Sequence, residues 1–210
     1  MATREQTIFQ ASGNKLITQD RDVYMAAKWE EPLILILDNV LSAEECDILI
    51  AMAKDRMQRA RIGVSRVVSE VRTSSSMFFE EGENEWIRRI EARAAELMSI
   101  PLQHAEPLQI LHYRAGEQYQ PHFDYFSNGS ADNRISTLIM YLNDVEEGGE
   151  TYFPSLGLSV MPRKGSAVYF EYFYKDSRLN ELTLHAGVPV VSGEKWVATQ
   201  WMRRQVQRHS

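Results

Sequence analysis

A succession of short strand patterns fills the second half of the chain, and it restricts the possible folds more than any other feature. The patterns occur at 108–113, 119–124, 134–142, 158–161, 166–171, 187–191 and 195–202. Turn sequences such as Glu147-Gly148-Gly149 and Arg163-Lys164-Gly165 separate them. Many short strands without helices between them favour a double-sheet jelly roll. We therefore expect a mainly β fold of the double-stranded β-helix type.

The first half of the chain predicts a buried strand and two supporting helices. The apolar run at 32–37 is typical of a buried strand. A capping box at 42–45 opens the first helix, whose apolar stripe continues to about Arg59. A second amphipathic pattern covers 86–97 and ends before Pro101. We expect both helices to pack on one side of the sheet.

The sequence predicts one domain. Its 210 residues can bury a substantial core, and no linker, internal repeat or low-complexity segment interrupts the chain. Within this domain, residues 1–105 are expected to provide helical support and residues 106–205 the jelly-roll catalytic core. Residues 1–30 have a mixed, polar composition, and we interpret them as an irregular or edge segment.

Composition and charge argue against several kinds of partner. Hydrophobic residues make up 44% of the chain and charged residues 25%, which is ordinary for a soluble globular protein. The net charge of -6 argues against a nucleic-acid partner. The longest apolar run is too short to cross a membrane, and the polar amino terminus lacks the apolar stretch of a signal peptide, so we expect a cytoplasmic protein. The single cysteine, Cys46, excludes an internal disulfide.

Two histidines and an aspartate on these strand patterns have the composition of a metal site. His122 and Asp124 are two residues apart, so on a strand both side chains point to one side and can reach the same ion. His185 comes from a later strand. Two imidazoles and one carboxylate are the ligands of non-haem Fe(II) oxygenases, and they leave positions open for a co-substrate and O2. Lys195 follows, and we expect a short hairpin at 187–193 to return its ammonium to the same cavity.

Taken singly, these residues have ordinary structural explanations. A His-x-Asp pair is common by chance, a lone His185 is typical of a hydrogen-bonded residue at a strand end, and Lys195 is typical of a solvated turn. The motifs around them make the combination specific. These are LHY at 111–113, YQPHFD at 119–124, RISTLIMYL at 134–142, EEGGET at 146–151, PRKGSA at 162–167, HAG at 185–187 and GEKW at 193–196, with Trp201.

On these motifs, the segment 108–203 resembles the catalytic domain of prolyl 4-hydroxylases, which are Fe(II)- and 2-oxoglutarate-dependent dioxygenases. The sequence VRTSS at 71–75 extends the resemblance upstream. The chain is most similar to small, single-domain bacterial members that resemble the collagen-modifying enzymes. The resemblance implies that His122, Asp124 and His185 hold Fe(II). It also implies that proline is hydroxylated at C4 with O2, 2-oxoglutarate and L-ascorbate, releasing succinate and CO2.

The same resemblance implies an anchor for the distal carboxylate of 2-oxoglutarate. Lys195 pairs with it, because a buried carboxylate needs a charged partner. Collagen-type enzymes carry Lys at this position, whereas lysyl hydroxylases and oxygen-sensing prolyl hydroxylases carry Arg, whose planar fork has a different shape. Tyr113 and Thr151 match positions whose hydroxyls contact the same carboxylate. A core aromatic and an ordinary strand residue remain the alternatives for these two.

The expected substrate is a proline-rich or collagen-like peptide. Tyr119, Trp201, Arg134 and Glu106 match positions that contact the peptide in related enzymes. Aromatic side chains suit a polyproline II strand, while Arg134 is suited to a peptide carbonyl and Glu106 to a peptide N–H. Tyr119 and Trp201 are alternatively core or rim aromatics. A homodimer is expected from the resemblance.

Two segments and two rival functions stay open. Residues 62–79, with Arg66 and Arg72, and residues 125–133 are either lids that close over the peptide or ordinary surface loops. The first rival is a 2-oxoglutarate oxygenase that acts on a free amino acid or on one folded protein, such as a translation factor. The second is a metal-binding jelly-roll module without enzymatic activity.

Overall fold

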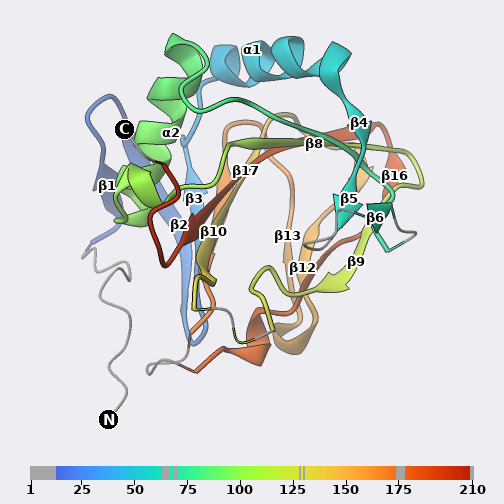
Figure 1. The fold of residues 1–210 in the computed structure, drawn as a ribbon. Coiled ribbons are helices and arrows are strands. Elements are labelled where there is room, and N and C mark those ends of the chain that lie inside the picture. The colour runs from blue at the N-terminus through green and yellow to red at the C-terminus, as the bar shows by residue number, and fades with distance from the viewer. Residues whose placement is uncertain are drawn as a thin grey trace.

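A large antiparallel sheet dominates the fold (Figure 1). The computed structural model describes residues 13–62, 67–68, 71–127, 129, 131–173 and 178–208. Within them the large sheet has nine strands. In spatial order these are β1 (Lys15–Ile17), β2 (Asp22–Glu30), β3 (Leu33–Asp38), β14 (Ala167–Glu171), β10 (Arg134–Tyr141), β17 (Glu194–Arg203), β8 (Gln109–Arg114), β7 (Ser75–Phe78) and β4 (Gln58–Arg59).

A smaller sheet packs against one face of the large one. Its strands, in spatial order, are β13 (Leu158–Val160), β12 (Thr151–Phe153), β15 (His185–Gly187) and β9 (Tyr119–His122). Two short pairs complete the described strands, β11 (Glu147–Gly148) with β16 (Val190–Ser192) and β5 (Arg61–Ile62) with β6 (Val67–Val68). Side chains of both sheets share one apolar cluster between them. The expected mainly β jelly roll is confirmed.

Two helices cover the other face of the large sheet (Figure 1). The predicted capping box is present at the start of α1 (Ala43–Ala53), where Ser42 and Glu45 bond each other's backbone N–H. The prediction that this helix continues to about Arg59 is wrong. It tightens into a 3-10 turn at Lys54–Arg56, and β4 then pairs with β7. The second helix, α2 (Glu85–Met98), ends before Pro101 as predicted.

The strands of the large sheet separate two interiors, because successive side chains of a strand point to opposite faces. On β10, Leu138 and Met140 pack toward the helices, while Ile139 and Tyr141 point toward the small sheet. β17 alternates in the same way. One face of each strand therefore builds a core, and the other face is free to line a cavity between the sheets.

The amino-terminal part of the chain is more regular than expected. Residues 15–30, interpreted above as irregular or edge, form β1 and the nine-residue β2, which pairs along β3. Their polar character reflects exposure of one face, which antiparallel sheets tolerate at an edge. Strands before residue 106 also pair with strands after it, since β3 pairs with β14 and β7 with β8. Among the described residues, no helix is both long and apolar enough to cross a membrane.

Candidate functional site

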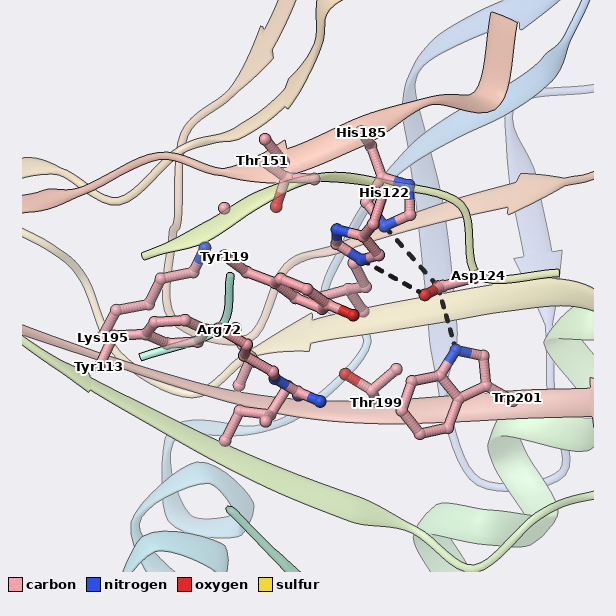
Figure 2. A pocket seen from close by; sticks show the side chains of 15 residues that line it. Arg72, Tyr113, Tyr119, His122, Asp124, Thr151, His185, Lys195, Thr199 and Trp201 are labelled. Atoms are coloured by element: carbon pink, nitrogen blue, oxygen red, sulfur yellow. Dashed lines mark hydrogen bonds and ion pairs between the residues drawn. The ribbon is translucent and has the colours of Figure 1, made fainter. Parts of the chain in front are cut away.

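Three side chains with metal-binding atoms meet at the edge of the small sheet. His122 ends β9, and His185 begins β15 directly opposite it in the strand pairing. Asp124 follows two residues after His122. Its Oδ1 is 3.5 Å from Nε2 of His122, and its Oδ2 is 3.7 Å from Nε2 of His185. The three ligand atoms lie within 4.8 Å of one another, so the structure brings the predicted triad together (Figure 2).

Each histidine is oriented by the backbone of its own chain segment. Nδ1 of His122 lies 2.8 Å from the carbonyl oxygen of Gln120, and Nδ1 of His185 lies 3.0 Å from that of Thr183. A carbonyl oxygen only accepts, so Nδ1 carries the proton and donates. In the neutral form of each ring, Nε2 then keeps its lone pair, and it faces Asp124. This is the tautomer that a metal-binding histidine needs.

The charges at this point also suit a metal. Burial, reinforced by His122, lowers the pKa of His185 to about 4, so its imidazole is neutral at neutral pH. Burial opposes ionisation of Asp124, but His185, His122 and Arg134 outweigh it and hold its pKa well below the ordinary value. Two imidazoles with one carboxylate are the donor set of the two-histidine-one-carboxylate Fe(II) oxygenases. The residues present therefore fit Fe(II).

A buried cation stands at the other end of the pocket. Lys195 is 4% exposed and forms no direct ion pair with a described residue, although the Glu150 carboxylate attracts it from a distance. Its Nζ is 5.5 Å from the ring centre of Tyr113 and 5.7 Å from that of Tyr141. Burial lowers the pKa of Lys195 to about 7. An ammonium in this position has no carboxylate in direct contact, and an entering carboxylate would supply one.

The chain reaches Lys195 by a different route from the one expected. β15 pairs with β9 and β12 in the small sheet, whereas β17 pairs with β8 and β10 in the large sheet. The prediction of a hairpin at 187–193 is therefore wrong, because the strands on either side of it belong to different sheets. His185 and Lys195 approach the pocket from opposite walls.

Tyr113 and Thr151 line the pocket together with Lys195. Tyr113 is the cross-strand neighbour of Lys195 on β8, and Thr151 begins β12. The hydroxyl of Tyr141 donates to Oγ1 of Thr151 at 2.8 Å. The structure thus brings both predicted hydroxyls to the cavity, where Figure 2 shows them with the lysine. Their contact with 2-oxoglutarate stays a prediction.

Two of the four predicted substrate residues also line the pocket. The ring of Tyr119 stacks on that of His122 with centres 3.4 Å apart, and the guanidinium of Arg72 covers its ring at 4.7 Å. Trp201 is 5% exposed and donates from Nε1 to Oδ2 of Asp124 at 3.0 Å. Both aromatic rings therefore contact metal-binding residues as well as the cavity (Figure 2).

The other two, Arg134 and Glu106, lie behind Trp201 and outside the lining. The guanidinium of Arg134 is 3.9 Å from a ring centre of Trp201 and makes two hydrogen bonds of 2.7 Å to Glu106. Arg203 also contacts Glu106, at 3.1 Å. Both oxygens of Glu106 are therefore engaged in ion pairs with arginine side chains. Neither side chain is among those that line the cavity, and their contact with a peptide stays a prediction.

Arg72 is a pocket residue that sequence reasoning assigned only to a possible lid. It is 5% exposed, donates to Oε1 of Gln109 at 3.3 Å, and its Nε has no partner among the described residues. Backbone hydrogen bonds tie its segment to β9, including Gln120 N–H to the Val71 carbonyl at 2.9 Å. This part of the segment is a fixed wall, while Arg66 lies outside the described residues. The VRTSS motif was the signal that could have located Arg72.

The second candidate lid is anchored at its base. Asn133 accepts from the backbone N–H of Phe126 at 2.7 Å and donates to its carbonyl at 2.8 Å. The ring of Phe126 lies between the guanidinium groups of Arg134 and Arg203, at 5.2 and 4.9 Å. Residues 128 and 130 lie outside the described part of the chain. Whether this segment closes over a peptide stays a prediction.

Comparison with known proteins identifies the family. Residues 108–203 match the model of the 2OG-Fe(II) oxygenase superfamily. The chain is 41% identical over 199 residues to Probable prolyl 4-hydroxylase 3 of Arabidopsis thaliana, covering 82% of this chain and 69% of that protein. It is 39% identical over 196 residues to Prolyl 4-hydroxylase 1 of the same organism, with coverage of 82% and 69%.

Solved structures agree with this assignment. A viral collagen prolyl hydroxylase from Paramecium Bursaria Chlorella virus-1, solved as a complex with 2-oxoglutarate, is 34% identical with a TM-score of 0.68, covering 81% of this chain and 95% of that one. A Pseudomonas putida prolyl-4-hydroxylase shares the fold at 21% identity and a TM-score of 0.61, covering 81% and 92%. The family predicted from sequence is confirmed. The chain belongs to the prolyl 4-hydroxylases of the 2OG-Fe(II) oxygenase superfamily, and it is an Fe(II)- and 2-oxoglutarate-dependent dioxygenase.

Proposed function

We propose that the protein hydroxylates C4 of proline residues in extended, proline-rich or collagen-like peptides. The observation that carries this proposal is the content of one pocket. The triad of His122, Asp124 and His185, the unpaired Lys195 and the ring of Tyr119 all face it. The similarity to a viral protein named collagen prolyl hydroxylase supports the same substrate class.

The roles of the residues follow from their positions. When bound, Fe(II) and 2-oxoglutarate supply the oxidising chemistry that puts one atom of O2 on proline and the other into succinate, with release of CO2. His122 and His185 would hold the metal through Nε2, and Asp124 through a carboxylate oxygen. Lys195 would pair with the distal carboxylate of 2-oxoglutarate and fix its orientation.

The peptide would lie against the side of the pocket formed by Tyr119 and Arg72. A polyproline II strand has no internal hydrogen bonds, so its carbonyl oxygens seek donors. Nε of Arg72 is such a donor, since it is buried and has no partner among the described residues. The Tyr119 ring offers an apolar face, and Ile139 and Val197 add apolar wall. These side chains exclude water from the reacting carbon.

Peptide hydroxylation tests the proposal directly. The protein is incubated with Fe(II), 2-oxoglutarate, ascorbate and a proline-rich peptide, and the products are read by mass spectrometry and succinate assay. We expect a gain of one oxygen atom on proline, matched by one succinate per event. A peptide with alanine in place of the target proline is the control. Succinate release that responds to a free amino acid or a folded translation factor, and never to the peptide, would contradict the substrate class.

L-Ascorbate is proposed as the reductant that keeps the metal in the Fe(II) state over many turnovers. Its omission is expected to shorten the linear phase of succinate formation without changing the initial rate, which a time course shows. The homodimer, the cytoplasmic location, and the lack of nucleic-acid and membrane partners stay predictions. Analytical ultracentrifugation of the purified protein decides the oligomeric state.

A further inference from the structure

Two donors from the large sheet converge on one oxygen of Asp124. Thr137, near the middle of β10, donates its hydroxyl to Oδ2 at 2.7 Å. Trp201, its direct partner across the β10–β17 pairing, donates Nε1–H to the same oxygen at 3.0 Å. A carboxylate oxygen has about two lone-pair sites, so these donors saturate Oδ2. Oδ1 faces Nε2 of His122 at 3.5 Å and receives no donor from the large sheet among the described residues, so it remains available.

A third residue fixes the direction of the Thr137 hydroxyl. The hydroxyl of Tyr172 contacts Oγ1 of Thr137. The single proton of Thr137 goes to the carboxylate, so the tyrosine must be the donor in this contact. Thr137 and Tyr172 have no exposed surface, so bulk water does not compete for these bonds. Tyr172, Thr137 and Asp124 thus form one chain with a defined direction.

We propose that Thr137 and Trp201, with Tyr172 behind Thr137, are positioning residues that present Oδ1 of Asp124 alone to the metal. A carboxylate without these donors rotates about its last bond and offers either oxygen or both. Groups that orient a metal ligand in this way typically change metal affinity by about 10–100-fold when removed. The inference rests on the assignment of the triad as the metal site, and it gives Trp201 a function besides any contact with substrate.

Metal binding without 2-oxoglutarate tests the inference apart from turnover. The probe is Co(II), which is stable in air, titrated into each purified variant by calorimetry. Thr137→Val keeps the shape of the side chain and loses the hydroxyl, and we expect its affinity for Co(II) to fall by about 10–100-fold. Thr137→Ser restores the hydroxyl and is expected to bind nearly as well as the wild type. Trp201→Phe is expected to lose affinity like Thr137→Val, and Tyr172→Phe to lose less.

The chain offers a matched control for each substitution. Trp196 lies on the same strand as Trp201 but on the opposite face, and its Nε1 has no partner among the described residues. Thr18 is 7% exposed, and its hydroxyl donates to the Arg21 carbonyl at 2.9 Å, in a turn between β1 and β2. Trp196→Phe and Thr18→Val change stability without touching Asp124. Both are expected to bind Co(II) with wild-type affinity.

The outcomes separate the two assignments. If His122→Ala binds Co(II) as tightly as the wild type, the triad is not the metal site and the positioning role falls with it. If His122→Ala loses Co(II) while Thr137→Val and Trp201→Phe bind it normally, the triad stands and the positioning role alone is overturned. Circular dichroism establishes that each variant is folded. Should Thr137→Val not fold, Trp201→Phe against Trp196→Phe decides the question.

Discussion

The two faces of β17 differ, because one belongs to the hydrophobic core and the other lines the candidate site. Toward the helices the strand presents Trp196, Ala198 and Met202, which belong to the apolar cluster shared with α1 and α2. Toward the small sheet it presents Lys195 and Trp201 among the residues that line the pocket. The backbone and the neighbouring strands are the same for both faces. Only the alternation of side chains separates them.

The contrast between the two faces of β17 shows where the fold carries buried polar groups that destabilise the free protein. Buried polar groups destabilise a protein unless they are paired. The buried side chains on the helix-facing side of β17 carry no charge, and their polar groups are the indole nitrogen of Trp196 and the amide of Gln200. Among the described residues, Lys195 on the inner side forms no direct ion pair, and Nε of Arg72 on a neighbouring wall has no hydrogen-bond partner. The outer face stabilises the free protein, and the inner face is complete only when ligands are bound.

Substitution of Lys195 should produce the largest effect on the inner face. In Lys195→Ala the distal carboxylate of 2-oxoglutarate is buried without a partner, and the loss of binding is about 3–5 kcal/mol. At about 1.4 kcal/mol per tenfold, the apparent constant for 2-oxoglutarate rises by two to three orders of magnitude or more. Succinate formation against 2-oxoglutarate concentration measures this. An unchanged constant would place the anchor elsewhere.

Position 195 also tests whether the buried ammonium destabilises the free protein. Lys195→Met removes an unpaired buried ammonium and fills its place with an apolar chain, so the free protein should become more stable by about 1–3 kcal/mol. Affinity for Co(II) should not change, because Lys195 is not a ligand. Thermal unfolding without ligands measures the first quantity. A lower melting temperature in Lys195→Met would break the contrast between the two faces.

Leu138 tests the helix-facing side of the large sheet, where a substitution should affect stability and not ligand binding. It is fully buried in the cluster between β10 and the helices, and its neighbour Ile139 lines the pocket on the other side of the strand. Leu138→Ala should lower the free energy of unfolding by about 2–5 kcal/mol. The apparent constants for 2-oxoglutarate and peptide should stay near wild type at a temperature where the variant is folded. Chemical denaturation and steady-state kinetics give both values.

Tyr119 should show a moderate and selective effect. Its ring covers His122 and faces the cavity, so Tyr119→Ala removes part of the proposed peptide surface. A loss of about 1–2 kcal/mol is typical for an aromatic at the centre of an interface, which is about a tenfold rise in the peptide constant. The constant for 2-oxoglutarate should change less. Equal changes in both would assign Tyr119 to the metal site rather than to the peptide surface.

The remaining prediction on the inner face concerns the pH dependence of 2-oxoglutarate binding. The pKa of Lys195 in the free protein is lowered to about 7 by burial, and only its protonated form pairs with a carboxylate. Affinity for 2-oxoglutarate should level off well below pH 7 and weaken by up to about tenfold per pH unit well above it, because binding must then take up a proton. Calorimetry in buffers of different ionisation enthalpy detects this uptake. A flat affinity from neutral to alkaline pH would contradict an unpaired lysine.

The stability of the free protein should change with pH in the opposite direction to its affinity for 2-oxoglutarate. Lys195 has a folded pKa of about 7 against an ordinary 10.5, so above pH 7 the unfolded chain binds more protons than the folded one. Through this residue the free protein gains stability as pH rises from about 7 toward 10.5. Lys195→Met should lack this contribution. Melting temperatures of the two proteins across this range provide the check.

The sequence alone was enough to predict features that depend on residues close together in the chain. The spacing of His122 and Asp124 places two ligands on one side of a strand, and the capping box marks the start of α1. Other features depend on partners far along the chain. Glu106 meets Arg203, 97 residues away, and Thr137 meets Tyr172, 35 residues away. No local sequence pattern predicts such pairs, so only the three-dimensional structure shows that these residues are in contact.

β2 shows a second limit of sequence reasoning. Its exposed face carries residues such as Lys28 and Glu30, and this polarity hid the regular alternation with the inner face. A bulge between Met25 and Ala27 shifts the pairing with β3 and breaks the period further. The strand exists because β3 offers an edge to pair with, which is a property of the neighbouring chain segment and not of the residues themselves.

The two ends of the pocket belong to different sheets, so bound 2-oxoglutarate would connect the sheets to each other. The metal-binding triad is attached to β9 and β15 of the small sheet, and Lys195 to β17 of the large one. Packed sheets lie about 10 Å apart, a gap that a metal ion and a short dicarboxylate together bridge. A molecule gripped at one end by each sheet resists their separation mechanically. Resistance to unfolding by force applied across the two sheets would then report directly on whether the pocket is loaded.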